Sequence, residues 1–295
     1  MKLTIKIRIS VIVVLMVLST QSLIAQVLYK ISSNSSAAPS YILATNKLKD
    51  MTFIDTIPNV FKCFNTCNKV ITEFAIQDYE AIATLRQAAL LPDSILLSNF
   101  FTDEQYQAID DALRINIGMG LDKLCRMKPS YLTEMFRDEL MKRWLNYNEE
   151  RSMETFFESV AIQRNIPIYG LDNIGETMYM LFDREPFHWQ CQELNKIIEY
   201  PEREIQLERT LHDMYNYGRL TDMAYTIKGP DNTSTLSFSD YKVFAKRNKE
   251  WVKRLRPYLL EGKAFITLDA IYLGGEEGLL AQLKAAGYRV KAVNR

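Results

Sequence analysis

The sequence predicts an α/β (α+β) protein in which strands from both ends of the chain form a central mixed β-sheet around a large helical insertion. Three observations predict this fold. Two short apolar runs near the start flank a Ser-rich loop, as in a hairpin, and residues 263–293 read as strand, loop, helix and strand. The long interval between these ends carries mostly helical periodicity, with one further strand in its middle.

The composition is that of an ordinary globular protein. The chain has 295 residues, of which 47% are hydrophobic and 24% are charged. Lys plus Arg and Asp plus Glu both number 36, and the isoelectric point is about 6.8. We therefore expect no nucleic-acid partner, and ligand binding has to be inferred from local sites.

Residues 1–25 have the layout of a secretory signal peptide. Three basic residues precede the apolar run Ile9–Leu18, and small residues lead to Ala25. The alternative is an uncleaved membrane anchor, because Leu23 is larger than ideal for a cleavage site, but the apolar run is short for a membrane span. We favour cleavage, which gives a periplasmic or secreted domain of residues 26–295 that meets the membrane only before cleavage.

The first strands are expected at 27–31 and 41–45, paired as a hairpin. A third is expected at 69–75, where Glu73 interrupts an apolar run. Glu73 either points into water from the rim of the sheet or ends a buried strand. In the second case it is a candidate for a functional site.

The middle of the chain predicts helices joined by short loops. Thr102 and Gln105 form a capping box, and Pro129 suits the first turn of another helix. The helix 152–164 leads into a strand at 166–171, which Asp172 ends. The expected helices are from residue 80, 102–115, 129–145, 152–164, 188–218 with an interruption at Pro201, 240–260 and 278–286.

Two segments of the second half bear on function. The run EREIQLERTLHD is most simply a solvated helical face. Gly274 and Gly275 follow the strand 264–268 and precede a helix and a last strand at 288–293. Open α/β sheets commonly place a ligand site at such a loop.

The chain has four cysteines, Cys63, Cys67, Cys125 and Cys191. Export would permit disulfides, and the sequence leaves free thiols and one long-range bridge as alternatives. Neither of the two histidines, His188 and His212, has ligand-like spacing to a cysteine, so a zinc site is poorly supported.

The order of several short motifs resembles the TraB/GumN family, whose animal relatives are the Tiki proteases. The resemblance runs over residues 28–293. Its pieces are LYKISSNSSAAPSYILATNKL, VITEF, LLPDSILLSNFFTDEQY, RMKP, METFFESVAIQRNIPIYGLD, the pair Arg247 and Asn248, and LDAIYLGGEEGLL. The resemblance implies a secreted bacterial protein with a metallopeptidase-like fold.

The chain departs from the family at two Gly-x-x-His motifs, whose histidines are thought to hold a catalytic metal. Residues 44–47 and 269–272 stand at these places, so Lys47 and Tyr272 replace the histidines. A protonated lysine has no lone pair for a metal, and a tyrosine phenol is a poor substitute for imidazole. We therefore expect the protein to be a pseudoenzyme without metal ligands or a cofactor.

The resemblance also implies the site residues. Glu73 and Arg247 match the acid and the arginine of the family and are the candidate catalytic positions. Lys47 could neutralise Glu73 or Asp269, either as a structural pair or as part of an anion or carboxylate site. The residues expected around the cleft are Lys47, Glu154, Asp172, Asp269, Tyr272 and Gly275.

Three functions remain open. The favoured one is a non-catalytic homologue that binds a peptide or small-molecule ligand in a degenerate cleft. The first alternative is a divergent metal-dependent hydrolase or peptidase that holds Mn²⁺ or Mg²⁺ through carboxylates. Its candidate residues are Glu73, Glu154, Asp172, Asp269 and Arg247. The second alternative is a structural envelope protein.

Overall fold

A computed structural model describes residues 26–75, 79–145, 152–228 and 238–293. The predicted signal peptide, residues 1–25, lies outside these ranges. Within them, no helix is both long enough and apolar enough to cross a membrane.

The strands form one mixed sheet of six strands in the order β4-β3-β5-β2-β1-β6. The four strands β4, β3, β5 and β2 run parallel to one another, and β1 is antiparallel to both β2 and β6. This arrangement confirms the predicted sheet from both chain ends. The bounds are β1 Leu28–Ser32, β2 Ser40–Thr45, β3 Lys69–Thr72, β4 Ile168–Gly170, β5 Ala264–Asp269 and β6 Arg289–Ala292.

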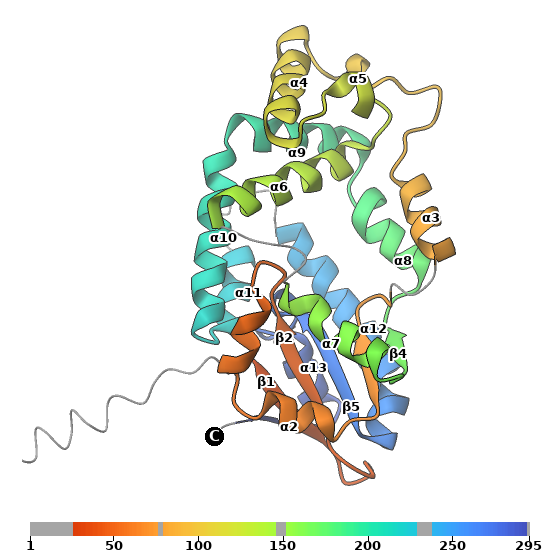
Figure 1. Ribbon diagram of the computed structural model, residues 1–295, viewed down its shortest axis with the longest axis vertical. Helices are drawn as coiled ribbons and strands as arrows, with labels where there is room; N and C mark the ends of the chain where they lie inside the picture. Colours follow the sequence, from red (N-terminus) through yellow and green to blue (C-terminus); the bar gives the residue numbers. More distant parts are fainter. Residues whose placement is uncertain (1–25, 76–78, 146–151, 229–237, 294–295) are drawn as a thin grey trace, which may run out of the picture.

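Figure 1 shows the sheet at one end of an elongated molecule and the helices α4, α5, α6 and α9 at the other. The α-helices are α2 Val60–Asn65, α3 Tyr79–Ala88, α4 Asp103–Ile117, α5 Leu121–Leu124, α6 Pro129–Leu145, α7 Met153–Gln163, α8 Ile174–Met178, α9 Phe187–Glu199, α10 Pro201–Asn216, α11 Leu220–Lys228, α12 Phe238–Glu261 and α13 Leu279–Ala285. Short 3₁₀ segments are η1 Met51–Thr56, η2 Leu97–Phe100 and η5 Ala270–Tyr272, and η4 Tyr179–Asp183 is a π-helix.

Local signals in the sequence explain several of these bounds. The Thr102 hydroxyl accepts from the Gln105 amide and the Gln105 side chain accepts from the Thr102 amide, which completes the predicted capping box. The β1–β2 hairpin, predicted from two nearby strands with a short polar loop between them, pairs Leu28 with Leu43. By contrast, α8, η4 and α11 were not predicted, because they are only five, five and nine residues long.

The third strand is shorter than predicted. It ends at Thr72 rather than at residue 75, and Glu73 is the first residue beyond it. The chain still follows β4 for two more steps, since the Leu171 amide donates to the Thr72 carbonyl and the Asp172 amide to the Glu73 carbonyl. These two bonds bring the carboxyl ends of β3 and β4 together.

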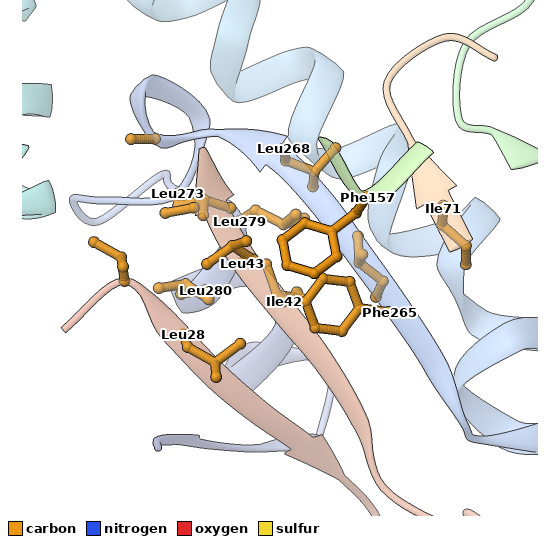
Figure 2. Close-up of a cluster of buried hydrophobic side chains, with 14 of the residues drawn as sticks. Leu28, Ile42, Leu43, Ile71, Phe157, Phe265, Leu268, Leu273, Leu279 and Leu280 are labelled. Atoms are coloured by element: carbon orange, nitrogen blue, oxygen red, sulfur yellow. The ribbon is translucent and has the colours of Figure 1, made fainter. Parts of the chain in front are cut away.

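Two hydrophobic cores support the two ends of the molecule. The first lies on the sheet, where Phe157 of α7 packs on Phe265 of β5 with 4.6 Å between ring centroids (Figure 2). The second lies among the helices of the middle region and includes Ile109, Leu132 and Leu194, all fully buried. The helical block is therefore a packed unit that can form one wall of a site.

All four cysteines are free thiols. The Cys67 thiol donates to the Cys63 carbonyl at 3.4 Å, in the turn that ends α2. Of the alternatives left open by the sequence, the structure has the free thiols.

Candidate functional site

The carboxyl ends of the four parallel strands meet at one edge of the sheet. Lys47 follows β2, Glu73 follows β3, Asp172 follows β4, and Asp269 is the last residue of β5. Because parallel strands end at the same edge, residues that are far apart in the sequence are neighbours here. The structure thus brings together four of the residues that the sequence singled out.

Glu73 is held by two donors. Its Oε1 accepts from the amide of Asp269 at 3.0 Å, and its Oε2 forms an ion pair with Nη1 of Arg247 at 3.0 Å. Burial raises the pKa of Glu73, although Arg247 and the amide of Asp269 oppose the shift. Glu73 therefore does not simply point into water from the rim of the sheet.

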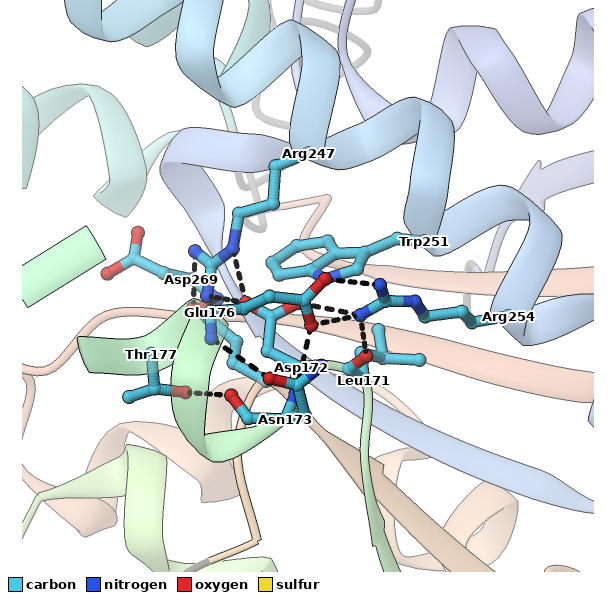
Figure 3. Close-up of polar contacts among 10 residues, drawn as sticks. Leu171, Asp172, Asn173, Glu176, Thr177, Arg247, Trp251, Arg254 and Asp269 are labelled. Atoms are coloured by element: carbon cyan, nitrogen blue, oxygen red, sulfur yellow. Dashed lines mark hydrogen bonds and ion pairs between the residues drawn. The ribbon is translucent and has the colours of Figure 1, made fainter. Parts of the chain in front are cut away.

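Asp172 is bound by three residues of one helix. Its Oδ2 accepts from Nε of Arg247 at 2.7 Å, and its Oδ1 accepts from the indole N–H of Trp251 at 2.6 Å. Arg254 adds a longer contact of 3.4 Å to Oδ1. The spacing of these residues on α12 puts them on one helical face, as Figure 3 shows. With its side chain only 4% exposed, Asp172 fastens α12 to the end of β4.

Arg247 bridges the two acids. Its guanidinium also lies over the rings of Trp251 and Tyr272, at 4.3 and 4.7 Å from their centroids. Burial lowers the pKa of Arg247, but Tyr272, Glu73 and Asp172 outweigh this, so the pKa is raised. Lysine could not replace Arg247, because only a planar guanidinium can bind two carboxylates and stack on two aromatic rings at once.

The loop after β5 is fixed by the residue next to Arg247. The Asn248 side-chain amide donates to the carbonyls of Tyr272 at 2.9 Å and Glu277 at 3.2 Å. The adjacent Arg247 and Asn248 thus hold the acids and the loop respectively.

Two adjoining cavities lie between the sheet edge and the helical block. One has a volume of about 310 Å³ and extends to Met180, Leu181 and Phe182 of η4. The other has a volume of about 250 Å³ and extends to Glu208 of α10 and Asp269. We call them together the cleft; the residues that line both are Glu73, Glu134, Arg137, Phe244 and Tyr272.

Lys47 lines the second cavity but does not pair as expected. Its ammonium lies 3.1 Å from Oδ1 of Asp138 on α6, and within the described ranges it forms no ion pair with Glu73 or Asp269. Burial lowers the pKa of Lys47, but the acids of α6 outweigh this and raise it. The expected pairing was wrong because the helical block supplies a nearer acid, which the sequence separates from Lys47 by 91 positions.

Asp269 is an unusual acid at the floor of the second cavity. Its Oδ1 accepts from the amide of Ile271 at 2.9 Å and so starts η5. Burial, followed by the charge of Glu73, raises the pKa of Asp269 to about 7. Burial also raises the pKa of Glu208, which lies across the same cavity. Within the described residues, the Glu208 carboxylate and Oδ2 of Asp269 have no hydrogen-bond partner.

The helical wall of the cleft was missed at the sequence level. Arg137 of α6 is 7% exposed and contacts Glu134 and Glu204. The prediction that EREIQLERTLHD is a solvated face was wrong for Glu204 and Glu208, since Glu204 is 2% exposed and Glu208 lines the cleft. The sequence held one indication of this, because Glu204 and Glu208 are four residues apart and therefore lie on the same side of the helix.

Of the residues expected around the cleft, Asp172 and Gly275 line neither cavity. The side chain of Glu154, in the first turn of α7, lies outside the described residues. Gly275 does not line either cavity; it has φ +81° in the loop after η5. Its neighbour Gly274 has a packing role, because a Cβ there would lie 1.9 Å from the carbonyl oxygen of Leu220. The two glycines shape the loop that carries Tyr272.

The residues present do not fit the metal that the family resemblance implies. Lys47 is engaged by Asp138, and burial raises the pKa of the Tyr272 phenol further above 10. Both oxygens of Asp172 are already bound to N–H donors. Within the described residues, no group of three or more His, Cys, Asp or Glu side chains is placed to hold a metal ion.

Comparison with known proteins agrees with the resemblance. The family model for the TraB/PrgY/gumN family matches residues 27–292. No curated protein matches the chain.

Proposed function

Because the chain belongs to the TraB/PrgY/gumN family, we propose that it is an exported, non-catalytic member that binds a ligand in the cleft. The proposal rests on the ion pair between Glu73 and Arg247, the two candidate catalytic residues. Glu73 and Arg247 are joined to each other and, through Arg247, to Asp172, so they serve as structure at the floor of the cleft. The cleft beside them remains open to a ligand.

The lining of the cleft supports a ligand with a positive charge and an apolar part. The second cavity has four acids, Glu73, Glu134, Glu208 and Asp269, against the two cations Lys47 and Arg137. A protonated amine could donate charge-assisted hydrogen bonds, which are strong, to Oδ2 of Asp269 and to the Glu208 carboxylate.

The first cavity suits the apolar part of such a ligand. Leu181 and Phe182 line it, together with Phe244, which is shared with the acidic cavity. A short peptide with a free amino group or a lysine side chain has both features.

Calorimetric titration of the purified protein with short peptides that contain lysine tests the proposal. Peptides with a free amine should bind, their acetylated forms should bind at least about tenfold more weakly, and Glu208→Gln should weaken binding similarly. Glu202→Gln is the matched control, because Glu202 is exposed on the same helix. Equal binding of free and acetylated peptides would refute a site for the positive charge.

Hydrolysis is the alternative that one observation favours. Asp269, with a pKa of about 7, could transfer protons at neutral pH beside Glu73. The same peptides should therefore be incubated with the protein, with and without Mn²⁺ or Mg²⁺. Cleavage that is lost in Glu73→Gln, with the variant still folded, would replace the binding proposal by a hydrolase.

A further inference from the structure

We propose that the protein has a second site that binds the phosphate group of a phosphate ester through Lys30, Lys62 and Lys291. It lies near the amino-terminal end of β2, whereas the cleft lies at the carboxyl end of this strand. This site is independent of the function proposed for the cleft.

The first observation is the register between β1 and β6. Lys30 lies directly opposite Lys291 in this antiparallel pair, and Tyr41 of β2 lies opposite Lys30 on the other side. Like charges in directly opposite positions repel each other and destabilise a sheet. The sheet therefore carries two lysines in directly opposite positions, at a cost in stability.

The second observation is the hollow that these lysines share. It has a volume of about 370 Å³, and Lys62 of α2 lines it together with Lys30 and Lys291. The remaining lining consists of Tyr41, Asn59, Cys63, Thr66, Ala292 and Val293. None of these residues is acidic, so three positive charges surround a hollow without compensation from its walls.

The third observation is the lack of acidic partners farther out. Within the described ranges, Lys30, Lys62 and Lys291 have no carboxylate within 4.0 Å. By contrast, Lys69 on β3 of the same sheet has its ammonium 2.8 Å from the carboxylate of Glu261, the last residue of α12. The three lysines are therefore available to an anion from outside the protein.

A phosphate ester fits this arrangement best. Several ammonium groups can share the oxygens of one phosphate dianion, and lysine binds phosphate well as a point charge. The hollow is within the size range of small-molecule sites, and its apolar residues Ala292 and Val293 could contact the esterified group. The source could be a soluble ester or the headgroup of an anionic lipid.

The test uses the purified full-length protein in low-salt, phosphate-free buffer. Glycerol phosphate is titrated by calorimetry, and flotation with vesicles of phosphatidylcholine plus phosphatidic acid is compared with vesicles of phosphatidylcholine alone. Binding of the soluble ester with no flotation identifies a soluble source, and flotation only with phosphatidic acid identifies a lipid. The absence of both would overturn the proposal.

Variants locate the site. Lys30→Gln and Lys291→Gln should each weaken binding about tenfold, whereas Lys253→Gln should not change it, because Lys253 is an exposed lysine of α12 paired with Glu250. Without ligand, Lys30→Gln should melt no lower than the wild type, since it removes the repulsion. A Lys253→Gln effect as large as that of Lys30→Gln would show unspecific attraction and overturn the site.

Discussion

Asp269→Asn should stabilise the protein at neutral and alkaline pH and have little effect below about pH 4. The folded protein holds the proton of Asp269 up to a pKa of about 7, whereas the ordinary value is 3.8. A group with a raised folded pKa stabilises the folded state fully below its unfolded pKa, and this contribution is lost progressively from about pH 4 until the pH passes 7. The difference between these two pKa values corresponds to at most about 4 kcal/mol of unfolding free energy. Asparagine keeps the acceptor for the Ile271 amide without the charge.

The measurement is the free energy of unfolding by denaturant at about pH 4, 5, 6, 7 and 8. The variant and the wild type should be about equally stable near pH 4, and the advantage of the variant should grow through pH 5 and 6 to about 2–4 kcal/mol at pH 8. Asp222→Asn is the control, because Asp222 forms an exposed pair with Arg219 whose loss should cost less than about 1 kcal/mol. A difference in stability between Asp269→Asn and the wild type that does not change from about pH 4 to about pH 8 would refute the reasoning.

Three further predictions address the floor of the cleft, the loop and export. Arg247→Met should lower the unfolding free energy by about 3–5 kcal/mol, because Asp172 would keep a buried charge without its main partner; denaturant unfolding measures this. Gly274→Ala should cost about 3 kcal/mol by the same assay, because its Cβ would overlap the backbone of Leu220; stability equal to wild type would contradict this close packing. N-terminal sequencing of the envelope fraction should find a protein that begins near Gln26, and an intact first residue on membrane-bound protein would indicate an anchor instead.

Much of the sheet and its acidic edge could be predicted from the sequence because the signals are local. Short apolar runs bounded by turn residues mark strands, and the acids Glu73 and Asp172 each stand directly after such a run. Parallel pairing then places the ends of these strands at one edge without further information. Arg247 required the family pattern, since nothing in its local sequence distinguishes it from the other cations of α12.

The helical wall could not be predicted because its partners are set by packing between distant helices. Arg137 and Glu204 are separated by 67 positions, and the charged patterns around them are also typical of exposed helices. The partner of Lys47 was missed for the same reason. A periodic pattern identifies the face of a helix but not the element that covers it.

The acids of the second cavity should make the cleft prefer cationic ligands, because their mutual repulsion destabilises the empty protein. When Asp269 ionises near neutral pH, the empty cleft gains a negative charge beside Glu73, and Lys47, which lines the same cavity, is already held by Asp138. A cationic ligand relieves this repulsion, whereas a neutral ligand of the same shape does not. The repulsion that lowers the stability of the empty protein therefore contributes to selectivity for a positive charge, because only a cation recovers that energy on binding. Arg247 cannot take this role, since Glu73 and Asp172 already hold its guanidinium.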